Sequence, residues 1–503
     1  MLARTRTFAI QGVDAVPVDV EVDIHRGLPA FSVVGLPDAA VRESRERVRA
    51  AIVNSGFDFP LQRITASLAP ADLRKAGPGF DLAIAAALLS ASGQVPADSL
   101  AAWWLAGELA LDGTIRGLSG VLAMAERVAH PATGEPAGLA VAAANAGEAG
   151  LVPGPEVAAL RSLRDLVALA RGELPPVAPQ DASPAPDRSA VPDLADLRGQ
   201  TGLRYGLEIA AAGGHGLLVV GPPGAGKSLG LRRLPSLLPP LSRREAIEVT
   251  KIASIAGRPP RDGTLVGRPF RAPHHTISTA GLVGGGSPAR PGEITLAHRG
   301  VLFLDELGEF SRASLEALRQ PLEEGRVTIA RARGSLTLPA RFQICAAANP
   351  CPCGHGEGSE RCTCTPERIR AYAARLSGAL ADRFDILQAV EQPSAAELAG
   401  DPGESSAAVA ARVVAARERQ AFRLGVGRTN ASMSETELIE HARPDEAGLA
   451  TLRAGYGELA LSGRGWSRVL KVARTIADLA GTTVVGHEQV ETALGMRRRR
   501  ALA

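Results

Sequence analysis

The chain has 503 residues, of which 45% are apolar and 22% charged, and its formal net charge is +3. This length exceeds what one hydrophobic core supports, so we expect about three domains of ordinary size. No uninterrupted apolar run reaches the roughly 18 residues that span a bilayer, and the N-terminus lacks the apolar stretch of a signal peptide. We therefore expect a soluble, cytoplasmic protein without a membrane partner.

The charge is unevenly distributed. Residues 1–170 carry 14 Lys and Arg against 18 Asp and Glu, which leaves 42 against 35 in the rest of the chain. The small net charge excludes a global field that attracts nucleic acid, so DNA binding would need local basic patches. One such run, Arg497 to Arg500 at the C-terminus, we interpret as a solvated tail.

Residues 1–171 alternate between strand-like and helix-like segments, which predicts an α+β domain. Residues 16–22 alternate with period two, as a half-buried strand does. Residues 39–54 form an amphipathic helix pattern, which Asp38 caps and Gly56 ends. The segment 68–89 ends in a helix that is apolar nearly all round and must be buried.

The loop from Lys75 to Gly79, together with residues 107–128, resembles the proteolytic domain of Lon proteases. That resemblance implies a ribosomal S5 domain-2-like fold and a Ser-Lys dyad, in which the amine activates the serine nucleophile. Gly79 and Met124 occupy the positions of the Lon serine and lysine, and neither can do this chemistry. We therefore expect a non-proteolytic domain that docks partners or organises a ring.

The next segment, 172–192, contains six prolines and no apolar periodicity, which is typical of a semi-extended linker. It is the clearest domain boundary in the chain. Beyond it, the pattern predicts a helix over about residues 202–212 that leads into a buried strand, Leu217 to Val220.

A glycine-rich loop follows that strand directly and reads GPPGAGKS, which fits the phosphate-binding pattern G-x-x-x-x-G-K-[ST]. Its glycines let backbone N–H groups turn onto a phosphate, the lysine neutralises the β- and γ-phosphates, and the serine hydroxyl holds Mg²⁺. ATP or GTP is therefore the predicted ligand. The loop consists of Gly221, Pro222, Pro223, Gly224, Ala225, Gly226, Lys227 and Ser228.

Two further apolar strands are predicted downstream, at residues 300–307 and 342–347. The first ends in Asp305 and Glu306, and such acids at a strand's carboxyl edge lie beside the phosphate loop in a doubly wound sheet. We expect Asp305 to hold the Mg²⁺ shell and Glu306 to orient the attacking water. Asn349 follows the second strand, at the place of the γ-phosphate sensor of AAA+ ATPases.

The block from Gly308 to Pro350 resembles the magnesium-chelatase and MCM branch of AAA+ proteins, in which a β-hairpin projects into the channel of a ring. Residues 327–330 and 335–338 alternate as its two strands. Arg331 and Arg333 at the turn would then line the pore and contact DNA phosphates without sequence preference. Plain solubility charges are the alternative interpretation of these arginines.

Several short motifs together identify the chain as similar to the ComM/YifB family. They are FSVVGLPDAAVRESRERVRAA (31–51), FRAPHHT (270–276), NPCPCG (349–354) and ARTIADL (473–479). The resemblance implies an α/β fold, with a P-loop AAA+ core at 193–395 and a helical lid at 396–503, behind the Lon-like domain. It also implies an ATP hydrolase, a DNA helicase that promotes branch migration in natural transformation.

The same resemblance assigns two arginines. Arg383 in LADRFDI matches the arginine finger, which reaches the γ-phosphate held by the neighbouring copy, so we expect a ring, a homo-hexamer. Arg464 matches sensor 2 on the lid, with Arg468 one turn later as the second choice.

Four of the five cysteines lie close together, at Cys351, Cys353, Cys362 and Cys364. Because cytoplasmic disulfides are disfavoured, tetrahedral Zn²⁺ on four thiolates is the sharper hypothesis, with His355 as a substitute ligand. Free thiols in a mobile loop are the alternative. His274 and His275 lack further ligands nearby in the sequence, so we interpret them as pore or nucleotide-sensing residues.

Two other functions stay open. A chelatase-type motor would use ATP to remodel a protein partner, and it predicts no stimulation of ATP hydrolysis by DNA. A Lon-like protease is the second, and Gly79 and Met124 argue against it.

Overall fold

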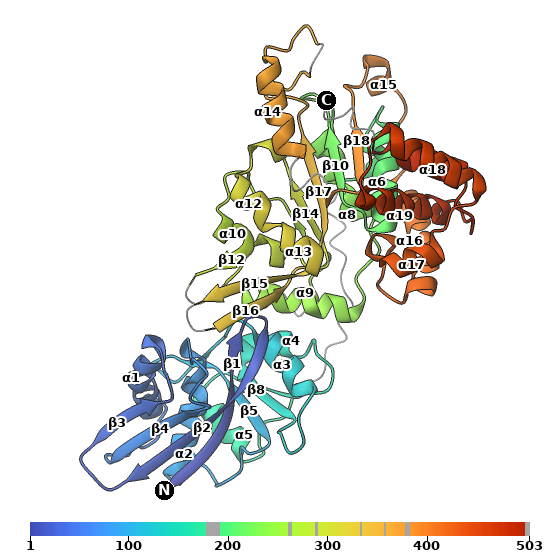
Figure 1. The fold of residues 1–503 in the computed structure, drawn as a ribbon. Coiled ribbons are helices and arrows are strands. Elements are labelled where there is room, and N and C mark those ends of the chain that lie inside the picture. Colours follow the sequence, from blue (N-terminus) through green and yellow to red (C-terminus); the bar gives the residue numbers. More distant parts are fainter. Residues whose placement is uncertain are drawn as a thin grey trace.

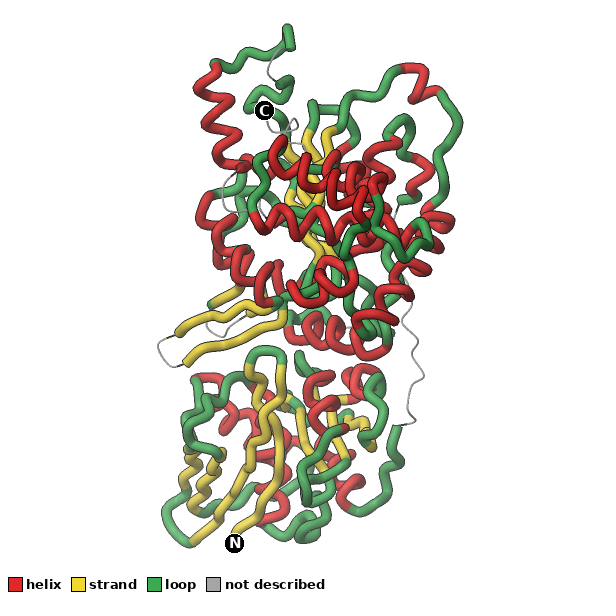
Figure 2. Tube along the Cα trace, turned by 45° about the vertical axis from the view of Figure 1, so that its right-hand side comes forward, coloured by secondary structure: helices red, strands yellow, loops and turns green. Residues whose placement is uncertain are grey.

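The structure is a computed structural model that describes residues 1–177, 192–259, 264–286, 290–331, 334–356, 359–377 and 383–497. Two large sheets organise them, one in the first 177 residues and one in the remainder (Figure 1). Figure 2 shows the resulting two bodies stacked end to end, with the hairpin of β15 and β16 extending beside their junction.

The first sheet has seven strands in the order β3-β4-β2-β1-β5-β8-β9. At its centre β1 and β2 form an antiparallel hairpin whose turn contains Gly12 at φ 68°, a backbone conformation that suits glycine. The period-two pattern at residues 16–22 lies within β2, so that prediction is confirmed. The strands are β1 (Leu2–Gln11), β2 (Asp14–His25), β3 (Ala30–Val34), β4 (Arg63–Ala69), β5 (Trp103–Ala106), β8 (Gly138–Ala142) and β9 (Glu156–Leu160), with the small pair β6 (Glu108–Leu109) and β7 (Ile115–Arg116) beside them.

Helices cover this sheet, and the predicted ones are present. The N–H of Val41 donates to the Asp38 side chain at 2.9 Å, which caps the first helix as expected. The helix that must be buried is α2, in which every residue except Ser90 is buried. The helices of this body are α1 (Ala39–Asn54), α2 (Asp81–Ala91), α3 (Val121–Ala129), α4 (Ala143–Ala149) and α5 (Leu163–Ala170).

The second sheet has five strands, all parallel, in the order β11-β14-β17-β10-β18. Its central strands are buried on both faces, which explains their uninterrupted apolar sequences. The three strands predicted for this part are confirmed as β10, β14 and β17. The strands are β10 (Leu217–Val220), β11 (Phe270–Arg271), β14 (Val301–Leu304), β17 (Gln343–Ala348) and β18 (Ile386–Ala389).

Helices pack around this sheet, and α6 (Thr201–Gly213) leads into β10 as predicted. The C-terminal helices gather on one side of the sheet, against α6 (Figure 1). They are α16 (Ser406–Leu424), α17 (Glu435–His441), α18 (Glu446–Glu458), α19 (Gly463–Leu479) and α20 (His487–Gly495). The other helices are α7 (Lys227–Leu231), α8 (Leu234–Leu237), α9 (Arg243–Ile255), α10 (Thr279–Val283), α11 (Glu293–Leu296), α12 (Arg312–Ala317), α13 (Arg319–Glu324), α14 (Pro366–Ser377) and α15 (Ala395–Ala399).

The predicted hairpin is also present. Strand β15 (Arg326–Arg331) pairs with β16 (Gly334–Pro339), with Ala330 opposite Ser335. A second small pair, β12 (Gly284–Gly285) with β13 (Arg290–Pro291), lies in the same part of the chain. The turn between β1 and β2 packs on the hairpin, since Val13 shares an apolar cluster with Leu338.

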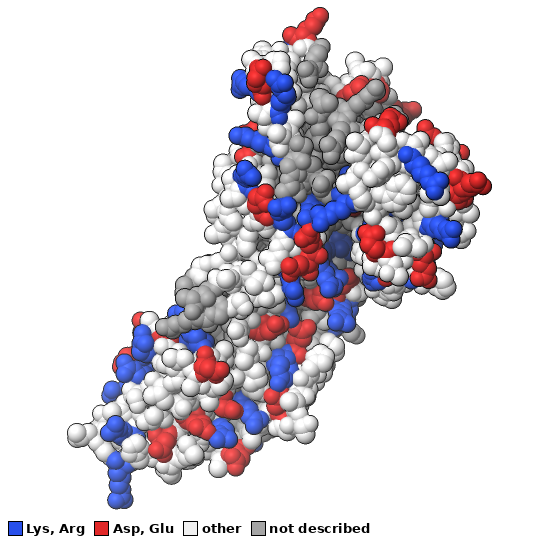
Figure 3. Space-filling model, in the orientation of Figure 1, with Lys and Arg blue, Asp and Glu red and all other residues white. Residues whose placement is uncertain are grey.

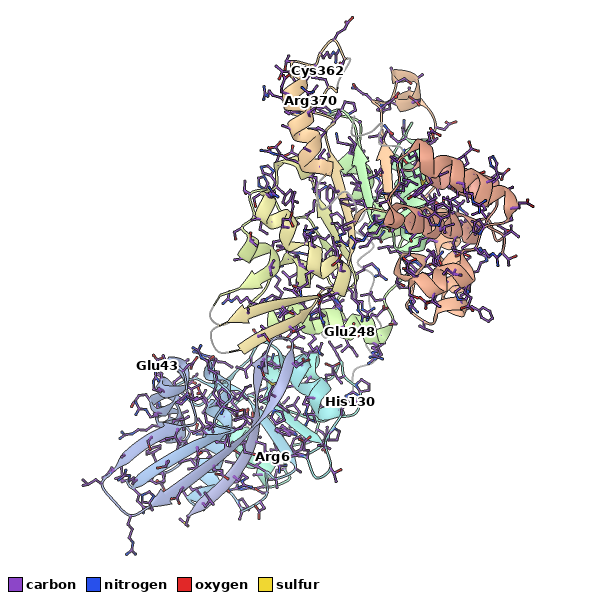
Figure 4. The ribbon with its side chains drawn as sticks, in the orientation of Figure 1. Arg6, Glu43, His130, Glu248, Cys362 and Arg370 are labelled. Carbon is purple, nitrogen blue, oxygen red and sulfur yellow. The ribbon has the colours of Figure 1, made fainter. Side chains whose placement is uncertain are left out.

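Helix α9 joins the two bodies. Its residues Val249 and Ala246 belong to an apolar cluster whose other members lie mostly in the first body. Lys251 on the same helix pairs with Glu126 at 2.5 Å and with Asp14 at 3.2 Å. Glu248, labelled in Figure 4, faces the other way and accepts from Arg299 at 2.9 Å. The helix therefore contacts the first body and the segment that enters β14.

The expectations for the proline-rich segment and for the C-terminal arginines are only partly testable, because many of these residues lie outside the described part of the structure. Most of the proline-rich segment, residues 178–191, lies outside them, as do residues 498–500. The interpretation of Arg497 as part of a solvated tail is wrong, because it is buried and donates to the Phe384 and Asp385 carbonyls. Within the described part of the chain, no helix combines the length and apolar character needed to cross a membrane.

Candidate functional site

The glycine loop lies between β10 and α7, at the carboxyl edge of the five-stranded sheet. Gly224 and Gly226 have φ of 78° and 81°, the left-handed region that side chains other than glycine rarely adopt. This backbone turns successive N–H groups to one side, which forms the kind of concavity that binds anions. The local sequence therefore produces a glycine-rich turn of this kind at the end of a buried strand.

Lys227 is held inside this loop. Its ammonium group donates to the Gly221 carbonyl at 2.6 Å, the Pro222 carbonyl at 2.9 Å and the Asn349 side-chain oxygen at 3.0 Å. Burial lowers the pKa of Lys227, while the nearby Asp305 and Glu306 carboxylates act in the opposite direction. The structure thus brings together Lys227 and Asn349, which are 122 residues apart in the chain.

Ser228 and Asp305 also meet here, since the Ser228 hydroxyl donates to the Asp305 carboxylate at 2.9 Å. A hydroxyl and a carboxylate oxygen are the donor types that Mg²⁺ prefers, and the ion keeps its remaining ligands from water and phosphate. The donor set at this point therefore fits a magnesium ion bound together with a nucleotide.

Glu306 adopts φ 52° and ψ 53°, a left-handed conformation that costs a non-glycine residue about 1–2 kcal/mol. Such strain is often found at functional sites, where the surrounding structure maintains it. The Glu306 carboxylate lies 3.3 Å from Nδ1 of His275, whose ring lies against that of His274 with centroids 4.1 Å apart and planes tilted by 34°. His275 follows β11, so a fourth strand contributes to this edge.

Arg383 lies at the opposite edge of the same sheet. It precedes β18, which runs parallel to β10, and the N–H of Asp385 donates to the Gly216 carbonyl just before β10. The rise of a strand puts about 16 Å between Gly216 and Gly221. Arg383 forms an ion pair with Glu323 of α13. The structure does not bring it to the glycine loop of its own chain.

The two lid arginines differ in their surroundings. Arg464 is exposed in the first turn of α19. Arg468, one turn later, is mostly buried and its Nε lies 3.2 Å from the Asp385 carboxylate. The second choice for sensor 2 is therefore engaged at the amino edge of the sheet, beside the segment that carries Arg383.

The structure describes the hairpin but not the side chains of the two arginines that are predicted to contact DNA. Arg331 ends β15, opposite Gly334, and its side chain is outside the described part of the structure, as is all of Arg333. The base of the hairpin is anchored by the buried Leu338 and by a backbone hydrogen bond in which Ala340 donates to the Gly325 carbonyl. Both arginines remain predicted DNA contacts.

The four cysteines of the predicted zinc site form one cluster, with all four sulfur atoms within 4.8 Å of one another. Cys351 lies 3.3 Å from Cys353 and 3.8 Å from Cys362, and Cys353 lies 3.6 Å from Cys362, measured between sulfurs. Tetrahedral zinc with Zn–S bonds of about 2.3 Å requires sulfurs about 3.8 Å apart. The cluster therefore fits zinc.

The thiols of this cluster differ in their pKa values. A backbone hydrogen bond from His355 is the largest of several contacts that lower the pKa of Cys353 to about 5, whereas burial and the neighbouring thiols raise the pKa of Cys362, to about 11, and that of Cys364. Cys353 is therefore the thiol that ionises most readily, and the thiolate is the form that ligates zinc. The cluster lies at the outer end of the molecule, above α14 (Figure 4). Lys and Arg side chains gather over α14 in Figure 3, where Arg368, Arg370 and Arg375 are exposed.

Sequence reasoning missed the partners of three predicted residues. The contact of His275 with Glu306 and the pairing of Arg383 with Glu323 were not foreseen. Asp385, two residues after Arg383 in the chain, was also overlooked, although a carboxylate directly after an apolar core residue such as Phe384 signals a buried polar partner.

Three family models match the chain. The model described as "Magnesium chelatase, subunit ChlI" matches residues 193–398. "Subunit ChlI of Mg-chelatase" matches residues 20–136, and "Magnesium chelatase, subunit ChlI C-terminal" matches residues 403–497.

Individual proteins are similar over nearly the full length. The uncharacterized protein YifB of Escherichia coli K12 is 43% identical over 498 residues, which cover 99% of this chain and 97% of that protein. The uncharacterized protein Rv2897c of Mycobacterium tuberculosis is 45% identical, with 99% of both chains covered. The competence protein ComM of Haemophilus influenzae is 42% identical, with coverage of 99% and 97%.

Proposed function

Because the chain belongs to the ComM and YifB family of magnesium-chelatase-like proteins, we propose that it is a cytoplasmic ATP hydrolase whose copies form a hexameric ring and act on DNA. The proposed activity is that of a helicase that promotes branch migration of recombination intermediates in natural transformation. The proposed domains are a non-proteolytic Lon-like domain (1–171), a linker (172–192), a P-loop AAA+ core (193–395) and a helical lid (396–503).

One observation carries the ATPase proposal: Lys227, Ser228, Asp305 and Asn349 are hydrogen-bonded to one another in pairs at a single sheet edge. ATP with Mg²⁺ supplies the phosphoryl group that is transferred to water. Lys227 neutralises charge on the phosphates, and Ser228 and Asp305 hold the ion. Asn349 would contact the terminal phosphate, and Glu306 would orient the attacking water and accept its proton.

The ring follows from the position of Arg383. Since it lies at the amino edge of the sheet and the glycine loop at the carboxyl edge, a finger role requires a second copy. A head-to-tail contact that places Arg383 of one copy at the loop of the next generates a closed ring when the rotation closes. In this proposal a single chain holds ATP but hydrolyses it poorly. Arg464 completes the site from the lid.

DNA is the proposed substrate for two reasons. The hairpin of β15 and β16 carries Arg331 and Arg333 at its end, and arginines contact phosphates without reading sequence. A relative 42% identical to this chain is named a competence protein. Aromatic residues, on which single strands stack, are only 3% of the chain, so electrostatic contacts should dominate and binding should weaken steeply with salt.

We propose that the cysteine cluster binds zinc, because the distances between its sulfur atoms fit tetrahedral geometry. The four ligands would be Cys351, Cys353, Cys362 and Cys364. The role of this zinc would be structural, since four thiolates leave no open position for a substrate.

The test is ATP-dependent resolution of a synthetic four-way DNA junction at low salt, with the wild type and Lys227→Ala compared at equal concentration. The wild type should resolve the junction and the variant should not. A wild type that hydrolyses ATP but leaves the junction intact would refute the helicase proposal while preserving the ATPase.

A chelatase-type motor that remodels a protein partner is the second candidate, and the magnesium-chelatase family models that match the chain favour it. It predicts the same ATP hydrolysis without stimulation by DNA, so a titration of DNA into the ATPase assay separates the two.

A further inference from the structure

The segment that carries Arg383 is fixed at its base by backbone hydrogen bonds and by burial. The N–H groups of Asp385 and Ile386 donate to the Gly216 carbonyl at 2.9 and 3.0 Å. Phe384, between Arg383 and Asp385, is fully buried in the core below the sheet. The direction in which Arg383 leaves the sheet is therefore set by its two successors.

Asp385 is held by side chains from two separate parts of the chain. Its carboxylate lies 3.1 Å from Nδ1 of His215, at the turn before β10, and 3.2 Å from Nε of Arg468 on α19. Burial by itself would raise the pKa of Asp385, but His215, Arg468 and Lys471 outweigh it, and the pKa is lowered. An anionic carboxylate thus links this segment to the lid.

Arg497, near the C-terminal end of the chain, hydrogen-bonds to the same segment. Its guanidinium donates to the Phe384 carbonyl at 3.0 Å and to the Asp385 carbonyl at 3.1 Å. Beside it, the Leu387 N–H donates to the Met496 carbonyl at 2.7 Å. Because β18 is the edge strand of the sheet, its outer backbone groups need such partners.

The contacts of Asp385 continue into the lid through buried side chains. Nε2 of His215 lies 2.8 Å from the Thr475 hydroxyl, and the Asn430 amide donates to that hydroxyl at 3.0 Å and to Asp478 at 2.8 Å. His215, Thr475, Asn430 and Asp478 are all fully buried. A buried network of this kind is rigid because breaking any one bond leaves an unpaired polar group.

We infer that Asp385 and Arg497 are positioning residues for Arg383: they clamp the base of this arginine so that its guanidinium is presented to the glycine loop of the next copy. The inference rests on the proposed function, in which Arg383 completes the neighbour's ATP site. Because Asp385 also contacts Arg468 and His215, the C-terminal helices of one copy would be connected to the ATP site of the next copy. Neither residue touches the nucleotide.

The first test compares turnover with ATP binding. A misplacement of about 1 Å at a reacting group costs about 100-fold in rate, so Asp385→Asn and Arg497→Met should each lower kcat by about 10- to 100-fold with the KM for ATP nearly unchanged. Arg497→Lys, which can still donate to both carbonyls, should recover much of the loss. Arg453→Met, on the exposed face of α18, is the matched control and should behave as wild type.

The second test mixes two impaired variants whose defects lie in different parts of the shared site. Lys227→Ala lacks its own site but keeps its Arg383, and Asp385→Asn keeps its own site but presents Arg383 poorly. Mixed rings should therefore hydrolyse ATP well above either protein alone. Arg497→Met mixed with Lys227→Ala should recover in the same way, which gives a second variant should Asp385→Asn fail to fold.

The mixture of Arg383→Ala with Lys227→Ala is the reference. If this reference mixture stays inactive, Arg383 does not act at the ATP site of the neighbouring copy. Both the proposed shared site and the positioning role of Asp385 and Arg497 are then contradicted. If the reference recovers and neither the Asp385 nor the Arg497 mixture does, these residues act on their own subunit's site or only on its stability, and the positioning role is overturned while the proposed function survives.

Discussion

The two edges of the five-stranded sheet are built in different ways. At the carboxyl edge, Asp305, Glu306 and Asn349 follow the ends of β14 and β17, and Lys227 follows β10 after the glycine loop; they meet because parallel strands end on one side. At the amino edge, Arg383 is surrounded by contacts drawn from the turn before β10, the C-terminal helices and the C-terminal end of the chain. One edge gathers its side chains by local geometry, whereas the segment at the other edge is fixed by long-range packing.

The difference suggests a division of labour between copies. In the proposed function, the carboxyl edge made of loops would bind and turn over a nucleotide of its own chain. The amino edge, which a buried network fixes, would present Arg383 to another copy without changing shape. Substitutions at the two edges should therefore fail in different ways.

The largest effect is expected at the carboxyl edge. Lys227→Ala removes the ammonium group that lies against Asn349 and the loop carbonyls, so both nucleotide binding and turnover should fall below detection. Fluorescent-nucleotide binding and phosphate release measure the two separately. Normal binding and turnover by this variant would mean that the glycine loop is not the nucleotide site.

At the amino edge, Arg383→Ala should lower turnover by about 1,000-fold, the lower end of the range for an arginine finger. Nucleotide binding should remain, because Arg383 lies far from the loop of its own chain. Glu323→Gln is a useful companion, since it removes the ion pair of Arg383 within the same chain and should change turnover far less. A loss of nucleotide binding by Arg383→Ala would contradict the separation of the two edges.

A smaller effect is expected for His275→Ala, which releases the Glu306 carboxylate from its neighbour at 3.3 Å. Without this contact Glu306 orients water less well, and we expect kcat to fall about 10-fold, with the KM for ATP unchanged. His274→Ala serves as the control because its ring lies against His275 without a described contact to Glu306. Equal losses in the two variants would argue against a specific role for His275.

The smallest effect on ATP turnover should come from the cysteine cluster, which belongs to neither edge. Protein purified without a metal-affinity tag should contain about one zinc per chain, and Cys353→Ser should lose it, with a lower melting temperature. Turnover per folded ring should change little. Elemental analysis that finds no zinc in the wild type would leave free thiols as the correct interpretation.

Local rules of sequence predicted much of the fold. The strand before the glycine loop, the acids after the second strand and the hairpin were all visible, because each depends on neighbours within a few residues. Helix α2 was predictable since a helix that is apolar on every side must be buried. The predicted position of Asp305 beside the glycine loop required only parallel strands.

The amino edge could not be predicted in this way. His215 and Asp385 are 170 residues apart, and Arg497 and Phe384 are 113 apart, so no periodicity or spacing connects them. The tail was misinterpreted for the same reason: four arginines in a row are typical of a solvated end, and only the open carbonyls of an edge strand explain why the first of them is buried.

The contact of α9 with the first body makes fragments that lack the first 177 residues unsuitable for functional tests. Val249 and Ile252 are buried there against residues of the first 177, and Ser254 donates to the buried Glu148. A fragment that begins after the proline-rich segment would expose this apolar stripe together with an unpaired Lys251, and aggregation would be hard to distinguish from loss of function. Point substitutions in the full-length chain avoid this exposure and are therefore preferable to fragments for testing function.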